Sequence, residues 1–157
     1  MTNELQLLIE ALEKKKVVLT DILAKSEEQS KVANAPKFEL EQFDALVNDK
    51  TDLLARLEQI DQGFDAVYHR IKEELVDKKQ SYKTEIERLQ QLIKDTLDLG
   101  AQIHATEART KDSMSNALLT SRQELVKKRV TSKSVMDYYK ANSQMSIMDP
   151  YFIDKKK

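Results

Sequence analysis

The sequence predicts an all-α protein: an elongated antiparallel bundle of three long helices, followed by a short C-terminal helix or tail. Three observations predict this fold. The 157 residues include only 2 Gly and 2 Pro, and most of the rest are helix formers such as Leu, Lys, Glu, Gln and Ala. Aromatic content is 6% with no Trp, which favours a thin core spread along helix seams. The third observation is a heptad repeat of apolar residues.

The heptad repeat is clearest from Leu46 to Leu75. Apolar positions recur there in steps of three, four or seven residues, at Leu46, Leu53, Leu57, Ile60, Phe64, Val67, Ile71 and Leu75. Lys50 interrupts the pattern. We expect Lys50, like Glu58 and Asp61 beside the seam, to lie in solvent or to extend its charged end to water. The alternative is that a polar seam position sets the helix register or the oligomeric state.

The first helix begins at a capping residue, Thr2 or Asn3, and ends near residue 32. Its apolar seam is interrupted at Lys15. The break that follows contains Pro36, which lacks an amide donor and fits the first turn of a new helix. The second helix is therefore predicted to start near Pro36 or Lys37.

The second helix should continue to about Val76, since the seam persists to that point. Gly63 lies inside it, and we interpret this glycine as a close helix crossing rather than a hinge. Asp77 to Ser81 contains no apolar residue and predicts a turn, although an unbroken helix is also compatible with the absence of Gly and Pro. The third helix resumes at Tyr82, and its apolar stripe thins between residues 102 and 115.

The sequence divides into a predicted helical bundle, residues 1–126, and a basic tail, residues 127–157. The tail has a charge balance of +5, against −6 for the rest of the chain. It also contains three of the five Met and three of the five Tyr residues. This density of large apolar side chains lies outside the heptad seam, so something must cover it.

Signatures of an enzyme or a metal site are missing from the sequence. It contains no Cys, no glycine-rich phosphate loop and no H-E-x-x-H motif. A di-iron bundle needs Glu three residues before His, but Ala66 and Ala101 precede His69 and His104 at that spacing. We therefore expect no catalytic residues, no metal and no cofactor. A bundle enzyme would need a pocket lined by convergent carboxylates.

No apolar run approaches the roughly 20 residues that span a bilayer, so we expect no membrane insertion and a cytoplasmic location. The basic tail is compatible with a nucleic-acid arm, but the acidic body opposes that interpretation. A membrane-surface segment would need a long helix with a basic face. Two interpretations remain: the tail folds back on the bundle, or it binds a partner through flexible Met side chains. Both can hold if a partner displaces the tail.

Two stretches resemble the FlgN-type flagellar export chaperones. FDALVNDKTDLLARLEQIDQGFDAVYHRI, with its D-K-x-x-L-L-x-x-L pattern, is similar to the second helix of that family, and SKSVMDYYKANSQ and DPYFIDKKK are similar to the tails of its members. The resemblance implies a cytoplasmic type III secretion chaperone. Such a chaperone holds flagellar hook-associated proteins, the filament-junction subunits, before export, and it can also contact the export apparatus.

Chaperones of this kind capture an amphipathic helix at the C-terminus of the client protein, which prevents premature assembly. The resemblance places client contact on the apolar residues around and within the tail: Leu125, Val126, Val135, Met136, Tyr138, Tyr139, Met145, Ile147 and Met148. The alternative is a structural coiled-coil protein that self-associates through the Leu46–Leu75 seam, with the tail as a dimer clasp.

Overall fold

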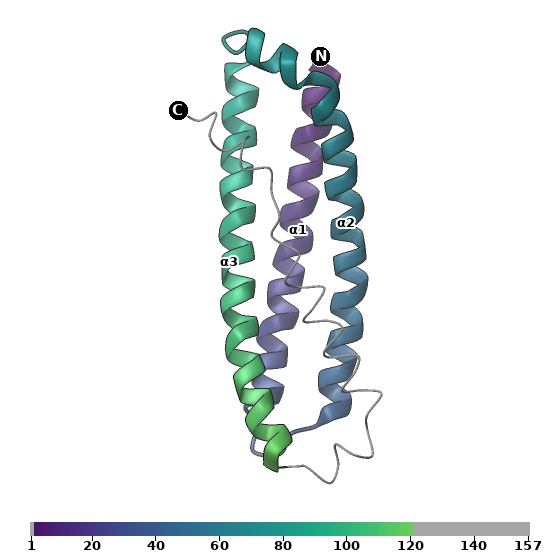
Figure 1. Cartoon of the computed structure of the whole chain (residues 1–157), viewed down its shortest axis with the longest axis vertical. Helices are drawn as coiled ribbons and strands as arrows, with labels where there is room; N and C mark the ends of the chain where they lie inside the picture. Colours follow the sequence, from purple (N-terminus) through teal and green to yellow (C-terminus); the bar gives the residue numbers. More distant parts are fainter. Residues whose placement is uncertain (1, 121–157) are drawn as a thin grey trace.

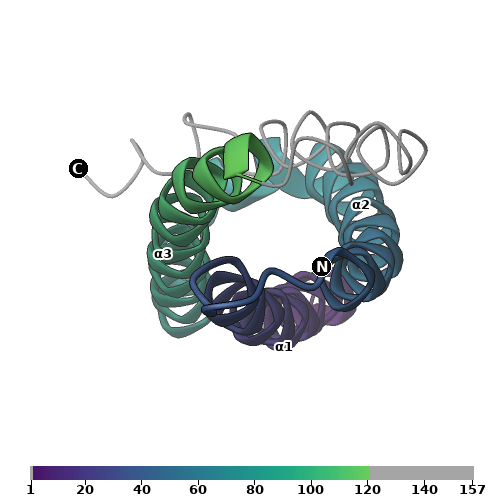
Figure 2. The same ribbon diagram turned by 90° about the horizontal axis from the view of Figure 1, so that it is seen from below.

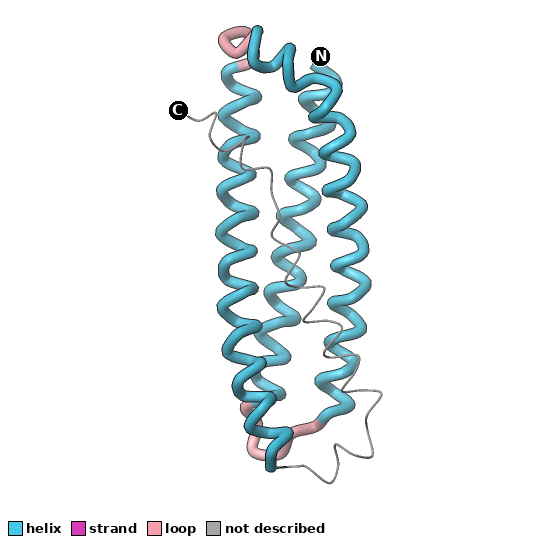
Figure 3. Tube along the Cα trace, viewed as in Figure 1, coloured by secondary structure: helices cyan, strands magenta, loops and turns pink. Residues whose placement is uncertain are grey.

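The computed structural model of the chain describes residues 2–120 and confirms the predicted all-α fold (Figure 1). Three long helices make up this part: α1 (Thr2–Ala33), α2 (Leu40–Asp77) and α3 (Lys83–Thr120). At 1.5 Å per residue, α2 and α3 are each about 57 Å long. Short loops join them, and the described residues contain no strand (Figure 3). The predicted short C-terminal helix and the boundary at residue 126 lie outside the described residues.

Successive helices run antiparallel, so α1 and α3 point the same way (Figure 1). Viewed along the bundle, α1 lies between α2 and α3 and packs along both of them (Figure 2). This arrangement makes α1 the helix against which both α2 and α3 pack.

Helix α2 begins at Leu40 rather than at the predicted Pro36, and the reason is an aromatic contact. Glu39 is the N-cap, in an extended conformation with φ −105° and ψ 98°. On either side of it Phe38 packs against Phe43, with ring centroids 5.8 Å apart. A hydrophobic contact between the residue before the N-cap and the fourth helical residue fixes where a helix starts. The first helix ends at Ala33, one residue from its predicted end.

The predicted turn between the second and third helices is confirmed, although it contains no glycine. Helix α2 ends at Asp77, and the Lys78 amide still donates to the Glu74 carbonyl over 2.9 Å. Ser81 N–H then donates to the Lys78 carbonyl over 3.0 Å, and α3 starts at Lys83. No described residue has a positive φ, so the turn is made of ordinary backbone conformations that any residue can adopt.

The heptad seam of α2 faces the interior of the bundle. Leu57, Phe64, Ile71 and Leu75 are buried, and Leu53, Ile60 and Val67 are half-buried and pack against the same core. Gly63 lies on the exposed side of α2, and a Cβ placed on it would meet nothing within 4 Å. The interpretation of Gly63 as a close helix crossing is therefore wrong within the described part of the chain.

The apolar core consists of three blocks that follow one another along the bundle. Block one is the largest and comprises Leu5, Leu8, Ile9, Leu12, Phe64, Tyr68, Ile71, Leu75, Leu89, Leu92 and Ile93. Block two comprises Val18, Leu19, Ile22, Leu57 and Ile103. Block three comprises Ala33, Phe43, Val47 and Met114 and lies at the end where α3 stops. Every helix contributes to every block.

Between the blocks, the positions that would continue the apolar core hold polar side chains. Lys15, Asp61 and Thr96 lie between blocks one and two in the order of all three helices. Ser26, Gln29, Lys50, Glu107 and Thr110 lie between blocks two and three. We call the second group the buried polar layer. None of the helices within residues 2–120 is both long and apolar enough to cross a membrane.

Candidate functional site

The buried polar layer is the most unusual feature of the described chain. Its members come from all three helices: Ser26 and Gln29 from α1, Lys50 from α2, and Glu107 and Thr110 from α3. Lys50, Gln29 and Thr110 have no exposed surface, and Ser26 and Glu107 are almost fully buried. Charged residues are rarely buried to this degree unless they are paired.

Lys50 and Glu107 form that pair across the centre of the bundle, between α2 and α3. The Lys50 ammonium donates a hydrogen bond to Glu107 Oε1 and a second one, 2.6 Å long, to Gln29 Oε1. Ser26 Oγ donates to the same Glu107 oxygen over 2.7 Å. The layer therefore links α1 to α2, α1 to α3, and α2 to α3.

Two further polar atoms lie at the same level. Thr110 is one turn beyond Glu107 on α3, and Gln29 is one turn beyond Ser26 on the parallel helix α1. Gln29 Nε2 and Thr110 Oγ1 are buried and make no hydrogen bond with another described residue. Buried polar atoms of this kind cost stability, so we expect an all-apolar layer of the same size to make the bundle more stable.

Burial lowers the pKa of Lys50 from its ordinary value of 10.5 to about 8, because the charged ammonium is removed from water. The charge of Glu107 and its hydrogen bond to Lys50 oppose this effect without cancelling it. The layer can thus lose one proton in mildly alkaline solution. Lys50 lies inside the bundle, however, and has no exposed surface to meet a substrate.

The lowered pKa predicts a dependence of stability on pH. Between pH 8 and 10.5 the unfolded chain keeps the Lys50 proton that the folded chain has lost. Stability therefore rises with pH in this window, by up to about 3 kcal/mol. The measurement is urea unfolding of the wild type and of a Lys50→Met/Glu107→Leu variant at both ends of the window. The free-energy difference between them should move in favour of the wild type as pH rises, and a constant or opposite difference would contradict the burial of a charged Lys50.

Lys15 and Asp61 form a second polar contact, between α1 and α2. Lys15 is buried, and its Nζ lies 2.8 Å from Asp61 Oδ1, whose side chain is one-third exposed. Burial raises the pKa of Asp61, the Lys15 charge lowers it, and the nearby Asp65 raises it again. Because Asp61 reaches water, this pair is less enclosed than the Lys50 pair.

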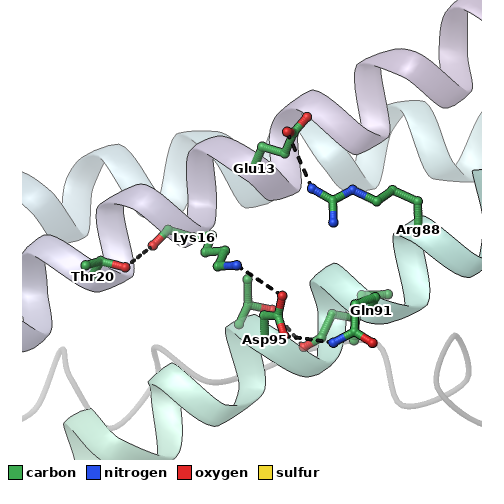
Figure 4. Close-up of polar contacts among 8 residues, drawn as sticks. Glu13, Lys16, Thr20, Arg88, Gln91 and Asp95 are labelled. Carbon is green, nitrogen blue, oxygen red and sulfur yellow. Dashed lines mark hydrogen bonds and ion pairs between the residues drawn. The ribbon is translucent and has the colours of Figure 1, made fainter.

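The outer edge of the α1–α3 contact has exposed polar contacts instead (Figure 4). Lys16 pairs with Asp95 over 3.1 Å, and Glu13 pairs with Arg88 over 3.7 Å. Gln91 donates to Asp95 over 2.9 Å, and hydrogen bonds from Gln91 and then Lys16 lower the pKa of Asp95. Exposed pairs of this kind contribute little to stability, so these contacts align the helices without deciding the fold.

The expectation that Lys50 is solvated is wrong. Its four-carbon stem occupies the core position that the heptad repeat assigns to it, and its ammonium is satisfied by Gln29 and Glu107. Glu58 is exposed as expected, and Asp61 is half-buried through its pair with Lys15. His104 is also half-buried, and its Nε2 makes no hydrogen bond with another described residue. No group of three potential metal ligands occurs within residues 2–120.

The residues to which the resemblance assigns client binding, from Leu125 to Met148, lie outside the described residues. Helix α3 ends at Thr120, at the end of the bundle that holds block three and the loop between α1 and α2 (Figure 1).

The site that the structure adds, the buried polar layer, has one sequence signal: Lys50 occupies a seam position of the second helix. Its partners in α3 and α1 had no signal, because pairing residues 57 positions apart requires the three-dimensional register. No family model matches the sequence, and comparisons with curated proteins and with solved structures found no match.

Proposed function

We propose that this chain is an export chaperone of the FlgN type, which binds the C-terminal amphipathic helix of a flagellar hook-associated protein before type III secretion. The proposal rests on the resemblance of the second helix and the tail, and on the chemistry of the tail. Residues 127–157 contain three Met and three Tyr residues together with eight Lys or Arg residues, a composition that suits an adaptable apolar partner surface.

One structural observation favours the proposal over self-association through the Leu46–Leu75 seam. The seam residues Leu57, Phe64 and Ile71 are buried against α1 and α3 of the same chain. A dimer formed through that seam would have to displace these contacts and expose the core that they fill. The bundle thus uses its heptad surface internally, and residues 127–157 remain the candidate surface for a partner.

The function is tested by comparing the full chain with a chain that ends at Val126. All three core blocks lie before that residue, so the shorter chain retains the whole described core. Each chain is mixed with a purified hook-associated protein, and the mixture is analysed by size-exclusion chromatography with light scattering. We expect only the full chain to form a soluble complex, because the tail supplies the client surface.

Circular dichroism of the two chains provides the control, since equal helicity per residue of the bundle shows that the shorter chain is folded. A complex of equal affinity with both chains would refute the assignment to the tail. If the client binds neither chain and the full chain alone is a dimer, the coiled-coil alternative is correct.

A further inference from the structure

The order of polar and apolar side chains along the bundle points to a conformational boundary. On α1 the sequence of buried side chains passes from Ile22 through Ser26 and Gln29 to Ala33. On α2, which runs the opposite way, Lys50 separates Leu57 from Val47. On α3 the residues Glu107 and Thr110 separate Ile103 from Met114. The fully buried apolar core is therefore interrupted on all three helices at one level, and the half-buried Leu54 of α2 packs against the blocks on both sides of it.

A buried ion pair contributes little net stability, because its attraction is offset by the loss of hydration. An apolar layer of the same size would connect blocks two and three through continuous side-chain contacts, so the two blocks would open together. Across the polar layer that coupling is reduced to the half-buried Leu54, which packs against both block two and block three, and Gln29 Nε2 and Thr110 Oγ1 make the layer still less favourable. Opening this end of the bundle returns the charges of the layer to water. The opening therefore costs little free energy beyond the loss of the apolar contacts in block three.

Within residues 2–120, the apolar contacts of block three are few. Block three has four buried members, and only Phe43 among them is aromatic. Its surroundings include Val32, Phe38 and Leu54, which are half-buried. Block one, at the opposite end, has eleven buried members. Cooperative units within a protein open at free energies that follow such differences in buried apolar contact.

We propose that the buried polar layer divides the bundle into two cooperative units, and that the end holding block three opens independently of blocks one and two. The opening unit comprises the last turn of α1, the loop to α2, the start of α2 up to Lys50, and α3 beyond Thr110. This proposal does not depend on a client. The unit that opens lies at the end of the bundle where the described part of α3 stops.

Hydrogen exchange of the full chain, followed by mass spectrometry of peptides, tests the proposal. We expect amides of residues 111–117 and 43–47, which are hydrogen-bonded within their helices, to exchange together, at least about tenfold faster than amides around Leu57 and Ile103. The step in protection should fall at the buried polar layer. Equal exchange of the two groups would overturn the proposal.

Two mild core substitutions make the test independent of absolute rates. Ile22→Val weakens block two, so it should speed exchange around Leu57 and Ile103 and leave the exchange of block three unchanged. Val47→Ala weakens block three, so it should speed exchange in both groups. If both variants speed the exchange of both groups, the bundle opens as a single unit and the proposal fails.

Filling the layer with apolar side chains should join the two units. In a variant combining Ser26→Ala, Gln29→Leu, Lys50→Met and Glu107→Leu, we expect exchange in block three to slow by about tenfold or more. Lys25→Met is the matched control, because Lys25 forms a partly exposed pair with Asp49 over 3.5 Å close to the same level. If block three exchanges as fast in the four-residue variant as in the wild type, the boundary does not lie at this layer.

Discussion

Replacing Lys50 alone with Met is expected to lower the free energy of unfolding at neutral pH by about 3 to 5 kcal/mol. The substitution leaves Glu107 buried without its cationic partner and removes the donor that Gln29 Oε1 accepts from. A buried carboxylate without its counter-charge carries the full cost of lost hydration. Urea unfolding followed by circular dichroism measures the change. A domain of this size has a total stability of about 5 to 15 kcal/mol, so the loss would be a large part of it.

The double variant Lys50→Met/Glu107→Leu separates the cost of an unpaired charge from the value of the pair. Because both charges are gone, it should recover most of the stability that the single variant loses. Lys25→Met, which removes one charge from the partly exposed pair with Asp49, should change stability by less than about 1 kcal/mol. A double variant as unstable as the single one would show that the loss does not come from the unpaired charge of Glu107, and would contradict this explanation.

Replacing Met136, Tyr138 and Tyr139 with Ser is expected to abolish binding of a hook-associated protein. These residues supply much of the apolar surface that the proposed function assigns to the tail, and a few large side chains dominate the binding energy of most interfaces. We expect affinity to fall by at least about a hundredfold, since each truncated anchor residue of this kind costs about 2 kcal/mol or more. Isothermal titration of the client helix into each variant measures the effect.

The same triple substitution should leave the helicity and unfolding of the bundle unchanged, because the described core lies entirely within residues 2–120. Tyr151→Ser is the matched control, since it removes one Tyr of the tail that lies outside the assigned set. Unchanged affinity in the triple variant would eliminate the site assignment, and equal losses from the control would show that the tail acts through its general apolar character.

The helices were predictable because their signals are local. The heptad seam of Leu46–Leu75 identified the buried face of α2, and the polar run Asp77–Ser81 identified the turn into α3. The start of α2 was missed by several residues because Pro36 is compatible with a first turn, whereas the contact between Phe38 and Phe43 decides the start. A helix start can thus depend on a side-chain contact that no propensity scale contains.

The buried polar layer was not predictable for a different reason. A lysine at a seam position can extend to water at the rim of a core, and Lys50 read alone favours that outcome. Its burial depends on Glu107 and Gln29, which come to the same level only after three helices have packed in register. Lys15 shows the intermediate case, since its stem is buried while its partner Asp61 still reaches water.

The most direct test of the proposed function is the light-scattering mass of the full chain mixed with a purified hook-associated protein. We expect a soluble species that contains both proteins and that disappears when the chain ends at Val126. A mixture in which the client stays separate and the full chain forms a homodimer would contradict the account, and would identify the chain as a self-associating coiled-coil protein.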